Sequence, residues 1–375
     1  MADFVIIGGG VYGCAVAWEL ARQGAEVCLL EAKEVACGAS GGLGTRGVRA
    51  NGRDVRELPF MEMAYEIWPT LHEALGAPTG YKRIGNVTLI EQELDLRKAE
   101  MAAWMQAQQG IPSQILSAAE LREREPYVGE QVIGALYCPK DGISDHTTTT
   151  RSYAQAARKL GAEIRENTLF DRLEAGNGHI SAVITAEEER IPIGKTLFML
   201  SNYHLLGYLK GAFNLQLPVW PLLPQVMLTE SISPHPIQHL IGHASRKLAM
   251  KMVEGDRVMI SGGWRGRYSE AGQKGETLPD QVEGNRLEAV AAFPVLADIG
   301  VADAAADRWE LIAVDNIPII DHLPGHNNVI MATGWSGHGW AISPAVSRLL
   351  AEWALTGQRP ALFNPFRYSR FAKVG

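Results

Sequence analysis

Cysteine is scarce in this chain of 375 residues. The four cysteines are Cys14, Cys28, Cys37 and Cys138, and they form no Cys-x-x-Cys pair and no zinc-ligand spacing. This pattern excludes a disulfide scaffold and gives no reason to expect a bound metal. Few, unpaired cysteines are typical of a reducing compartment, so we expect a cytoplasmic protein.

Blocks of basic residues and long hydrophobic runs are also missing. The formal net charge is −7 and no basic cluster occurs, so neither nucleic acid nor an anionic membrane surface is an expected partner. The apolar stretch from Phe4 to Ala21 contains a glycine cluster and Glu19, and no basic residue precedes it. It therefore predicts neither a signal peptide nor a membrane span.

Hydrophobic residues make up 46% of the chain, an ordinary globular balance, and a chain of this length usually forms two cores. Alternating strand and helix patterns in 1–80, 145–215 and 316–375 predict a discontinuous α/β domain with a Rossmann-like, nucleotide-binding type of fold. Short β-rich runs between Pro, His and Gly turns predict a second, substrate-binding domain over 81–144 and 216–315. We expect a mainly antiparallel sheet (α+β) there.

Hydrophobic periodicity predicts the individual elements. The expected strands are 4–7, 25–30, 81–90, 163–169, 180–185, 196–200, 225–229, 248–253, 257–262 and 329–332. The expected helices are 14–23, 58–75, 94–109, 147–160, 282–294 and 344–355. Residues 38–53 are rich in glycine and arginine and are expected to form a long functional loop.

A glycine pattern follows the first expected strand and opens the first expected helix. In Gly8-x-Gly10-x-x-Gly13, the first glycine permits a tight turn and the second lets a pyrophosphate approach the backbone. The third lets the helix pack closely on the sheet. The helix N-terminus then faces the phosphates with free N–H groups. Val11 and Tyr12 lie within this turn and are expected cofactor contacts.

The second expected strand ends next to Glu31. A carboxylate at this place accepts hydrogen bonds from a ribose diol and would repel a 2′-phosphate, which disfavours NADP. Ala32 is expected to lie beside the same ribose. The strand, glycines, helix and acid together predict a dinucleotide, with NAD and FAD both open.

Five further segments carry a resemblance to a known family. They are 38–42 (GASGG), 45–49 (TRGVR), 134–137 (GALY), 226–230 (VMLTE) and 332–340 (ATGWSGHGW). In this order they resemble the D-amino acid oxidase-like family of FAD-dependent oxidoreductases, in particular the branch of sarcosine oxidase beta subunits and glycine oxidase. The resemblance implies FAD as the cofactor. No cysteine carries a marker of covalent attachment, so we expect non-covalent FAD.

The resemblance assigns the FAD contacts to separate segments. It implies that Ser40, Gly41 and Gly42 lie at the pyrophosphate or ribityl chain, and that Phe170 lies near the adenine. It also implies that the turn 334–340 directs N–H groups at the pyrimidine side of the flavin, where charge develops on reduction. The remaining expected FAD contacts are Arg46, Gly47, Ser201, Gly334, Gly337, His338, Gly339 and Trp340.

Two arginines are the main catalytic candidates. In monomeric sarcosine oxidases a T-R-x-x-R segment places one arginine near the flavin and the next on the substrate carboxylate. The resemblance therefore implies that Arg46 lies beside the flavin and that Arg49 anchors the substrate, since guanidinium binds carboxylate in a bidentate manner. His338 is a third candidate, as a donor to flavin or substrate. The alternative, solvated arginines in a basic loop with Arg53 and Arg56, stays open.

Several positions depart from the family pattern. Ala341 stands where a lysine often helps to hold the substrate carboxylate, and Glu310 stands where D-amino acid and glycine oxidases carry an arginine. Glu310 is therefore expected to contact an amine or a basic head group of the substrate, with Arg308 as a candidate substitute for the arginine. Met259 lies near the place of the lysine that activates oxygen in monomeric sarcosine oxidases, which favours a dehydrogenase. The segment 201–204 (SNYH) replaces a Gly-Ala pair.

A few other side chains are candidates for the substrate pocket or for a metal site. Gln225 and Trp335 are expected to line the substrate pocket, and core or rim packing is the alternative for both. His235, His239 and His243 recur every four residues, but prolines interrupt the start of the segment and no nearby cysteine or acid completes a ligand set. We therefore expect no metal.

The resemblance implies oxidation of a secondary amine or amino acid of the sarcosine, glycine, opine or imino-acid type. Hydride would pass from the substrate α-carbon to flavin N5, giving an imine that hydrolyses. Two alternatives stay open: an FAD-dependent α-hydroxy acid oxidoreductase, and a flavin-carrying beta subunit active only within a hetero-oligomeric dehydrogenase. Expected partners are the small amine and a partner subunit or electron acceptor.

Overall fold

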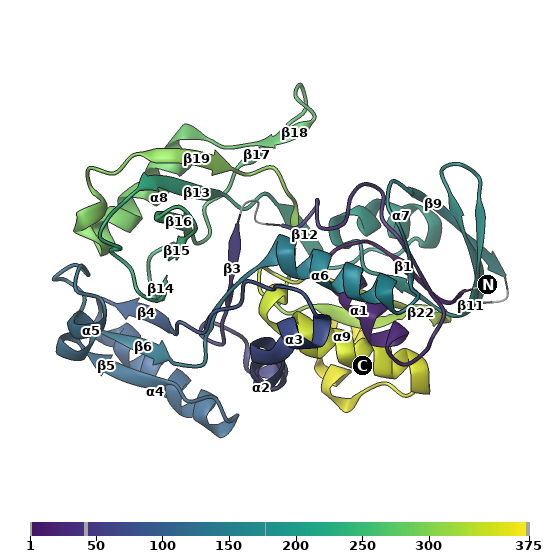
Figure 1. The fold of residues 1–375 in the computed structure, drawn as a ribbon, viewed down its shortest axis with the longest axis horizontal. Helices are drawn as coiled ribbons and strands as arrows, with labels where there is room; N and C mark the ends of the chain where they lie inside the picture. Colours follow the sequence, from purple (N-terminus) through teal and green to yellow (C-terminus); the bar gives the residue numbers. More distant parts are fainter. Residues whose placement is uncertain (1, 41–43, 177, 373–375) are drawn as a thin grey trace.

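Two large sheets form the frame of the molecule (Figure 1). The structure is a computed structural model, and it describes residues 2–40, 44–176 and 178–372. The first sheet contains, in spatial order, β21 (Ile319–Leu323), β22 (His326–Thr333), β11 (Arg190–Met199), β1 (Ala2–Ile7), β2 (Val27–Leu30) and β8 (Glu163–Arg165). At its side, β10 (His179–Thr185) pairs with β11 and with β9 (Phe170–Gly176).

The second sheet is antiparallel except for one strand pair. Its strands, in spatial order, are β19 (Val301–Ala305), β13 (Val226–Ser231), β16 (Arg257–Ser261), β15 (Ala249–Val253), β14 (Leu240–His243), β4 (Asn86–Ile90), β6 (Gly134–Cys138) and β5 (Gln114–Ser117). The parallel pair is β14 with β4. The predicted fold class, a Rossmann-like α/β part plus a mainly antiparallel α+β part, is confirmed.

Three small strand pairs and nine helices complete the described part of the chain. The pairs are β3 (Thr45–Val48) with β7 (Gly142–Asp145), β12 (Val219–Leu222) with β20 (Glu310–Ala313), and β17 (Arg267–Ser269) with β18 (Lys274–Glu276). The helices are α1 (Val11–Ala21), α2 (Leu58–Ile67), α3 (Leu71–Leu75), α4 (Glu93–Gln108), α5 (Ala118–Arg124), α6 (His146–Lys159), α7 (Leu205–Phe213), α8 (Pro279–Ala292) and α9 (Gly339–Thr356). None of these helices is long and apolar enough to cross a bilayer.

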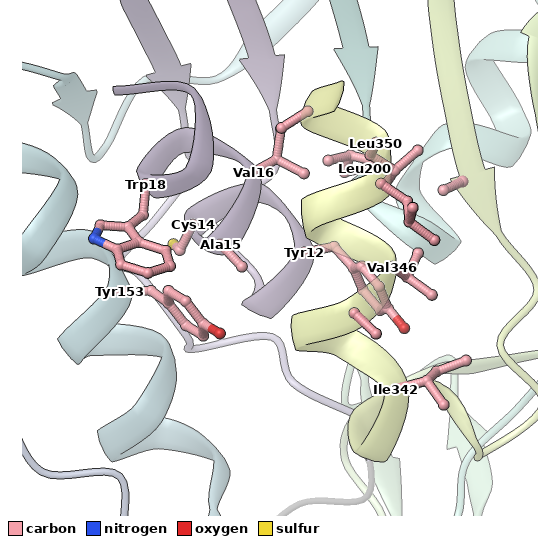
Figure 2. Close-up of a cluster of buried hydrophobic side chains, with 14 of the residues drawn as sticks. Tyr12, Cys14, Ala15, Val16, Trp18, Tyr153, Leu200, Ile342, Val346 and Leu350 are labelled. Atoms are coloured by element: carbon pink, nitrogen blue, oxygen red, sulfur yellow. The ribbon is translucent and has the colours of Figure 1, made fainter. Parts of the chain in front are cut away.

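Helix α1 lies at the centre of the first core. Figure 2 shows it between α6 and α9, with Trp18 directed at Tyr153 of α6. The two rings meet edge to face with 5.6 Å between their centroids. On the other side, Val16 points toward the part of α9 that carries Leu350 (Figure 2), and both side chains are fully buried. Every residue of α1 from Tyr12 to Ala21 is buried. Burial of each such aliphatic side chain stabilises the fold by ~1.5–3 kcal/mol.

The second core lies between one face of the second sheet and α8. Met250 of β15 and Ile260 of β16 pack in one buried cluster with Ala289 of α8. Because side chains alternate along a strand, Lys251 and Met259 point to the opposite face of the sheet. That face is turned toward β3, which lies where the two halves of the molecule meet (Figure 1).

The structure corrects two expectations. The expected loop 38–53 contains strand β3, which pairs antiparallel with β7. The expected single helix 58–75 is two helices, α2 and α3, separated by a 3₁₀ turn at Trp68–Thr70. The break has a local cause, because Pro69 has no N–H to donate to the carbonyl of Tyr65, and this carbonyl accepts from Arg83 instead (3.2 Å). The domain boundaries given above stay a prediction.

Candidate active site

The glycine turn between β1 and α1 is built on close backbone contacts. Gly8 has a φ of 113°, and a Cβ there would lie 2.9 Å from the backbone of Ser201 at the end of β11. A Cβ on Gly13 would overlap the carbonyl oxygen of Gly8. Gly10 differs, since a Cβ there would meet no atom of the described residues within 4 Å. The turn is thus closed toward the protein and open beside Gly10.

Helix α1 starts at this open place. Gly10 is its N-cap residue, no side chain of the described residues caps the helix, and its first turn holds no acidic residue. The free N–H groups and the positive end of the helix dipole are therefore available to an anion. Val11, the first helical residue, is half-buried at the same place.

Glu31 fixes the other side of the turn. Its Oε2 accepts from the N–H of Gly9 (2.7 Å) and its Oε1 from the N–H of Lys33 (2.9 Å), while Ala32 between them is exposed. The carbonyl of Glu31 accepts from the N–H of Thr168. The segment that leads into Phe170 therefore runs beside Glu31, and the Phe170 ring lies edge to face on Tyr208 (4.8 Å).

The turn 334–340 is held against β20. The N–H of Ser336 donates to the carbonyl of Leu311, and the Ser336 hydroxyl accepts from the N–H of Ala313 (3.0 Å). Helix α9 begins within this segment, at Gly339, with no side-chain cap from the described residues and no acid in its first turn. Trp340 has a buried Nε1 with no hydrogen-bond partner in the described part of the chain. This end of the site therefore has free N–H donors.

The two turns are joined by stacked aromatic rings. Tyr12 and Trp335 lie parallel, with centroids 3.8 Å apart and planes 7° apart. The Tyr12 hydroxyl donates to the carbonyl of Gly339 (2.6 Å). The structure therefore places Trp335, expected at the substrate, beside the glycine turn.

The unusual segment 201–204 has a structural role at the same turn. Asn202 adopts a φ of 47°, and its side-chain oxygen accepts from the Thr333 hydroxyl (3.0 Å) and from the N–H of Gly334 (3.4 Å). Tyr203 stacks on Trp309, with centroids 4.6 Å apart. The segment thus ties the end of β11 to the end of β22 and to β20.

Arg46 and Glu310 lie close together in the site. Arg46 of β3 donates from Nη2 to the carbonyl of Ser40 (3.1 Å), and burial lowers its pKa to about 10. Glu310 accepts from the Ser40 hydroxyl and from the N–H of Leu311 (3.1 Å), and burial raises the pKa of this carboxyl. Glu310 was expected at the substrate, and the structure places it beside Ser40, an expected cofactor contact. Gly41 and Gly42 lie outside the described residues.

Arg49 lies half-buried just after β3. It donates to the carbonyl of Asn51, and burial together with the neighbouring Arg53 lowers its pKa. Its segment is held by Asp141, which accepts from the N–H of Ala50 (2.8 Å) and from the Tyr65 hydroxyl. Burial raises the pKa of Asp141 to about 6. The Asp-Gly pair in the sequence indicates a turn, and nothing local predicts that this carboxyl is buried.

Arg53, considered above as a solvated residue, is buried in an ion pair. Its Nη1 donates to Glu57 (3.2 Å), and the exposed fractions of the two side chains are 2% and 0%. Its Nη2 donates to the carbonyl of His338 (2.9 Å). By contrast, Arg56 is exposed and paired with Asp54. The i,i+4 spacing of Arg53 and Glu57 was the only sequence signal for this pair.

His338 lies beside this ion pair. Its Nδ1 is 3.9 Å from Glu57, and neither atom of this contact has a hydrogen-bond partner among the described residues. Burial, with Arg49 and Arg53 nearby, holds the pKa of His338 well below its usual range. The imidazole is therefore neutral and can form a hydrogen bond with a ligand without carrying a charge.

Two further predicted positions and one unpredicted residue complete the site. Gln225 donates to the carbonyl of Gln281 (3.1 Å), which directs its amide nitrogen toward α8. Gly47 lies in β3 against Leu240 of the second sheet.

His146 was not predicted from the sequence. Its Nδ1 donates to the carbonyl of Gly44 (2.7 Å), and burial lowers its pKa to about 4, so a neutral histidine holds the start of β3.

The histidines at intervals of four do not share a ligand position. His235 pairs with Asp256, His239 with Glu125, and His243 with Glu91. Within the described ranges no three His, Cys, Asp or Glu side chains are grouped so that they could hold a metal ion.

A comparison with protein families identifies the chain. The family model for FAD dependent oxidoreductases matches residues 3–353. The chain belongs to this family. FAD is its cofactor, and the family resemblance found in the sequence is confirmed.

Three relatives of this FAD-dependent oxidoreductase show how its sequence and fold compare. Sarcosine oxidase subunit beta from Arthrobacter sp. is 26% identical, over 98% of this chain and 91% of that protein. The bifunctional protein ThiO/ThiG from Synechocystis sp. is 23% identical over 99% of this chain and 54% of that protein, so the chain spans about half the length of this relative. The structure of L-proline dehydrogenase from P. horikoshii superposes with a TM-score of 0.89 at 22% identity, covering 98% of both chains.

The described residues fit FAD. A pyrophosphate can approach Gly10, whose outer side is open, and can use the uncapped start of α1. Glu31, next to β2, stays the expected contact to a ribose diol. At the other end, the uncapped start of α9 and the unpartnered Nε1 of Trp340 offer donors to a flavin ring.

We expect FAD to be bound without a covalent link. Cys14, Cys28 and Cys138 are buried, and burial raises the pKa of the Cys138 thiol to about 11, so it is a poor nucleophile. Cys37 is exposed, and the pKa of its thiol is raised as well, chiefly by desolvation. Acid precipitation of the holoenzyme should therefore release all the yellow cofactor into the supernatant. Flavin fluorescence that stays with the denatured chain on a gel would contradict this expectation.

Proposed function

We propose that this flavoenzyme oxidises a secondary amine or amino acid that carries a carboxylate. The observation that carries the proposal is Arg49, a half-buried guanidinium just after β3, at the junction of the two halves of the molecule. Two of the relatives named above are a sarcosine oxidase subunit and an L-proline dehydrogenase. Sarcosine and L-proline both combine a secondary amine with a carboxylate.

The chain's own residues bind and orient the substrate. Arg49 holds the carboxylate, and Asp141 positions Arg49 by fixing the backbone of Ala50. His338 is neutral, and its Nδ1 has no hydrogen-bond partner among the described residues, so it offers a hydrogen bond to the bound molecule without adding charge. An amine that binds unprotonated then needs no strong protein base. The chemistry that bound FAD supplies is two-electron acceptance: hydride leaves the substrate α-carbon, and the resulting imine hydrolyses in water.

Turnover with an artificial dye as electron acceptor tests the substrate class. We expect the purified holoenzyme to reduce the dye with at least one of sarcosine, proline or glycine, and to leave glycolate and lactate untouched. Dye reduction with the hydroxy acids alone would contradict the proposal and favour an α-hydroxy acid oxidoreductase.

A second candidate is a flavin-carrying subunit that works only with a partner. It is supported by the relationship to a sarcosine oxidase beta subunit over nearly the whole chain. It is also supported by an exposed apolar stripe on α4, formed by Leu94, Met101 and Trp104, each more than 60% exposed. Turnover by the purified chain alone would exclude this candidate.

A further inference from the structure

A buried lysine lies on the sheet that faces the arginines. Lys251 stands in the middle of β15 and is 4% exposed. Its neighbours Met250 and Met252 pack into the core under α8. Since side chains alternate along the strand, Lys251 points to the opposite face.

That opposite face meets β3 and the residue before it. Met259, the cross-strand partner of Lys251 on β16, lies so close to Gly44 that a Cβ there would be 2.5 Å from its Cε. On the other side of β15, Leu240 of β14 would lie 2.9 Å from a Cβ on Gly47. Both strands that flank β15 therefore contact the segment that carries Arg46, and Lys251 lies between these two contacts.

The charges around Lys251 are all of one sign. The charged groups that act on its amine are Arg46 and Arg49, while its strand neighbours Met259 and Leu240 are uncharged. Each of the two arginines has two carboxylates nearby. Those near Arg46 are Asp145 and Glu310. Those near Arg49 are Asp141 and Glu57. In the described part of the chain, Lys251 has no hydrogen-bond or ion-pair partner.

A buried ammonium without a partner is costly, so such a lysine either loses its proton or binds an anion. Burial and the two arginines lower the pKa of Lys251 to about 7. The amine is therefore close to half protonated near neutral pH, and an anion beside it would restore the proton.

We propose that Lys251 and Arg49 together hold the substrate carboxylate, Lys251 from the second sheet and Arg49 from the segment after β3. The inference rests on the proposed function, because it concerns the same substrate. It also gives the site a second cation, since Ala341 leaves no lysine at the position where the family resemblance places one.

Carboxylate binding should then be linked to proton uptake. Above about pH 7 the free amine is mostly neutral, whereas the complex contains the ammonium, so binding takes up about one proton. The affinity for the carboxylate should fall as pH rises above the pKa of the free Lys251. A purely structural lysine would show neither effect.

Calorimetric titration of the holoenzyme with methoxyacetate tests this inference. This probe has a carboxylate but no amine or hydroxyl to oxidise, and its methyl ester serves as the neutral comparison. Titrations at about pH 8 in buffers of different ionisation enthalpy measure the protons taken up. The variants are Lys251→Met, Lys251→Arg and, as an exposed control on the same segment, Lys247→Met, whose ammonium lies over the Trp264 ring.

We expect Lys251→Met to weaken methoxyacetate binding by about 30-fold or more and to abolish proton uptake. Lys251→Arg should bind without proton uptake, because guanidinium stays charged, and Lys247→Met should behave as the unmodified enzyme. Unchanged affinity and unchanged proton uptake in Lys251→Met would overturn the inference. If this variant does not fold, wild-type-like proton uptake in Lys251→Arg would overturn it equally.

The outcomes separate this inference from the proposed function. If sarcosine or proline reduces the flavin and Lys251→Met binds methoxyacetate normally, only the role of Lys251 is wrong. If Lys251→Met loses methoxyacetate binding and no amine reduces the flavin, the carboxylate site stands and the amine assignment is wrong.

Discussion

Replacing Arg49 by alanine is expected to raise KM for a carboxylate-bearing amine substrate by about 30-fold or more. The change removes a half-buried guanidinium and leaves the substrate carboxylate with an incomplete set of donors. The cost of losing one partner of such a charge pair is ~2–5 kcal/mol. Steady-state kinetics with the best amine substrate measure this effect.

Two controls make the Arg49 result specific. Arg56→Ala removes an arginine from the same stretch of chain, where it is exposed and paired with Asp54, and should leave KM unchanged. A substrate analogue with its carboxylate esterified should lose most of the difference between the unmodified enzyme and Arg49→Ala. Equal kinetics for the acid substrate in both proteins would remove Arg49 from the site.

Replacing Gly10 by alanine is expected to abolish tight FAD binding while the chain still folds. A Cβ on Gly10 meets no atom within 4 Å in the part of the chain that the structure describes, and the φ of −75° at Gly10 suits alanine. The added methyl group would instead occupy the space through which a pyrophosphate approaches the backbone. Flavin content after purification, and titration of the apoprotein with FAD, measure the loss.

Neighbouring glycines provide matched controls for this variant. Gly13→Ala should destabilise the apoprotein itself, because its Cβ would overlap the carbonyl oxygen of Gly8. Gly211→Ala in α7 adds a methyl group in open space, and should retain FAD with stability equal or higher by ~0.5–1 kcal/mol. A Gly10→Ala protein with full flavin content would show that the pyrophosphate does not lie at this turn.

The nucleotide end of the site was predictable because its signals are local. β1, the glycine turn, α1 and β2 follow one another in the sequence, and each has a recognisable pattern of its own. β3 was missed because its four residues, TRGV, show no clear alternation. Its strand partner β7 comes from a distant segment, which a periodicity argument cannot find.

The substrate end of the site depends on contacts between remote strands. Lys251 in β15, Asp141 before β7 and His146 at the start of α6 are far from the arginines in the sequence. They lie near the segment 44–50 only because β3 pairs with β7 and the second sheet contacts β3. Each looks ordinary in the sequence. The family resemblance points to the position of Met259, but the residue that carries the charge is Lys251, its partner on the neighbouring strand.

Anaerobic reduction of the bound flavin tests the central claim, amine oxidation, most directly, because it needs neither an electron acceptor nor a partner subunit. The purified holoenzyme is mixed with sarcosine, proline or glycine, and separately with glycolate or lactate, while the visible flavin absorbance is followed. The account predicts that at least one of the amines bleaches the flavin and that the hydroxy acids do not. Bleaching by the hydroxy acids alone would contradict it.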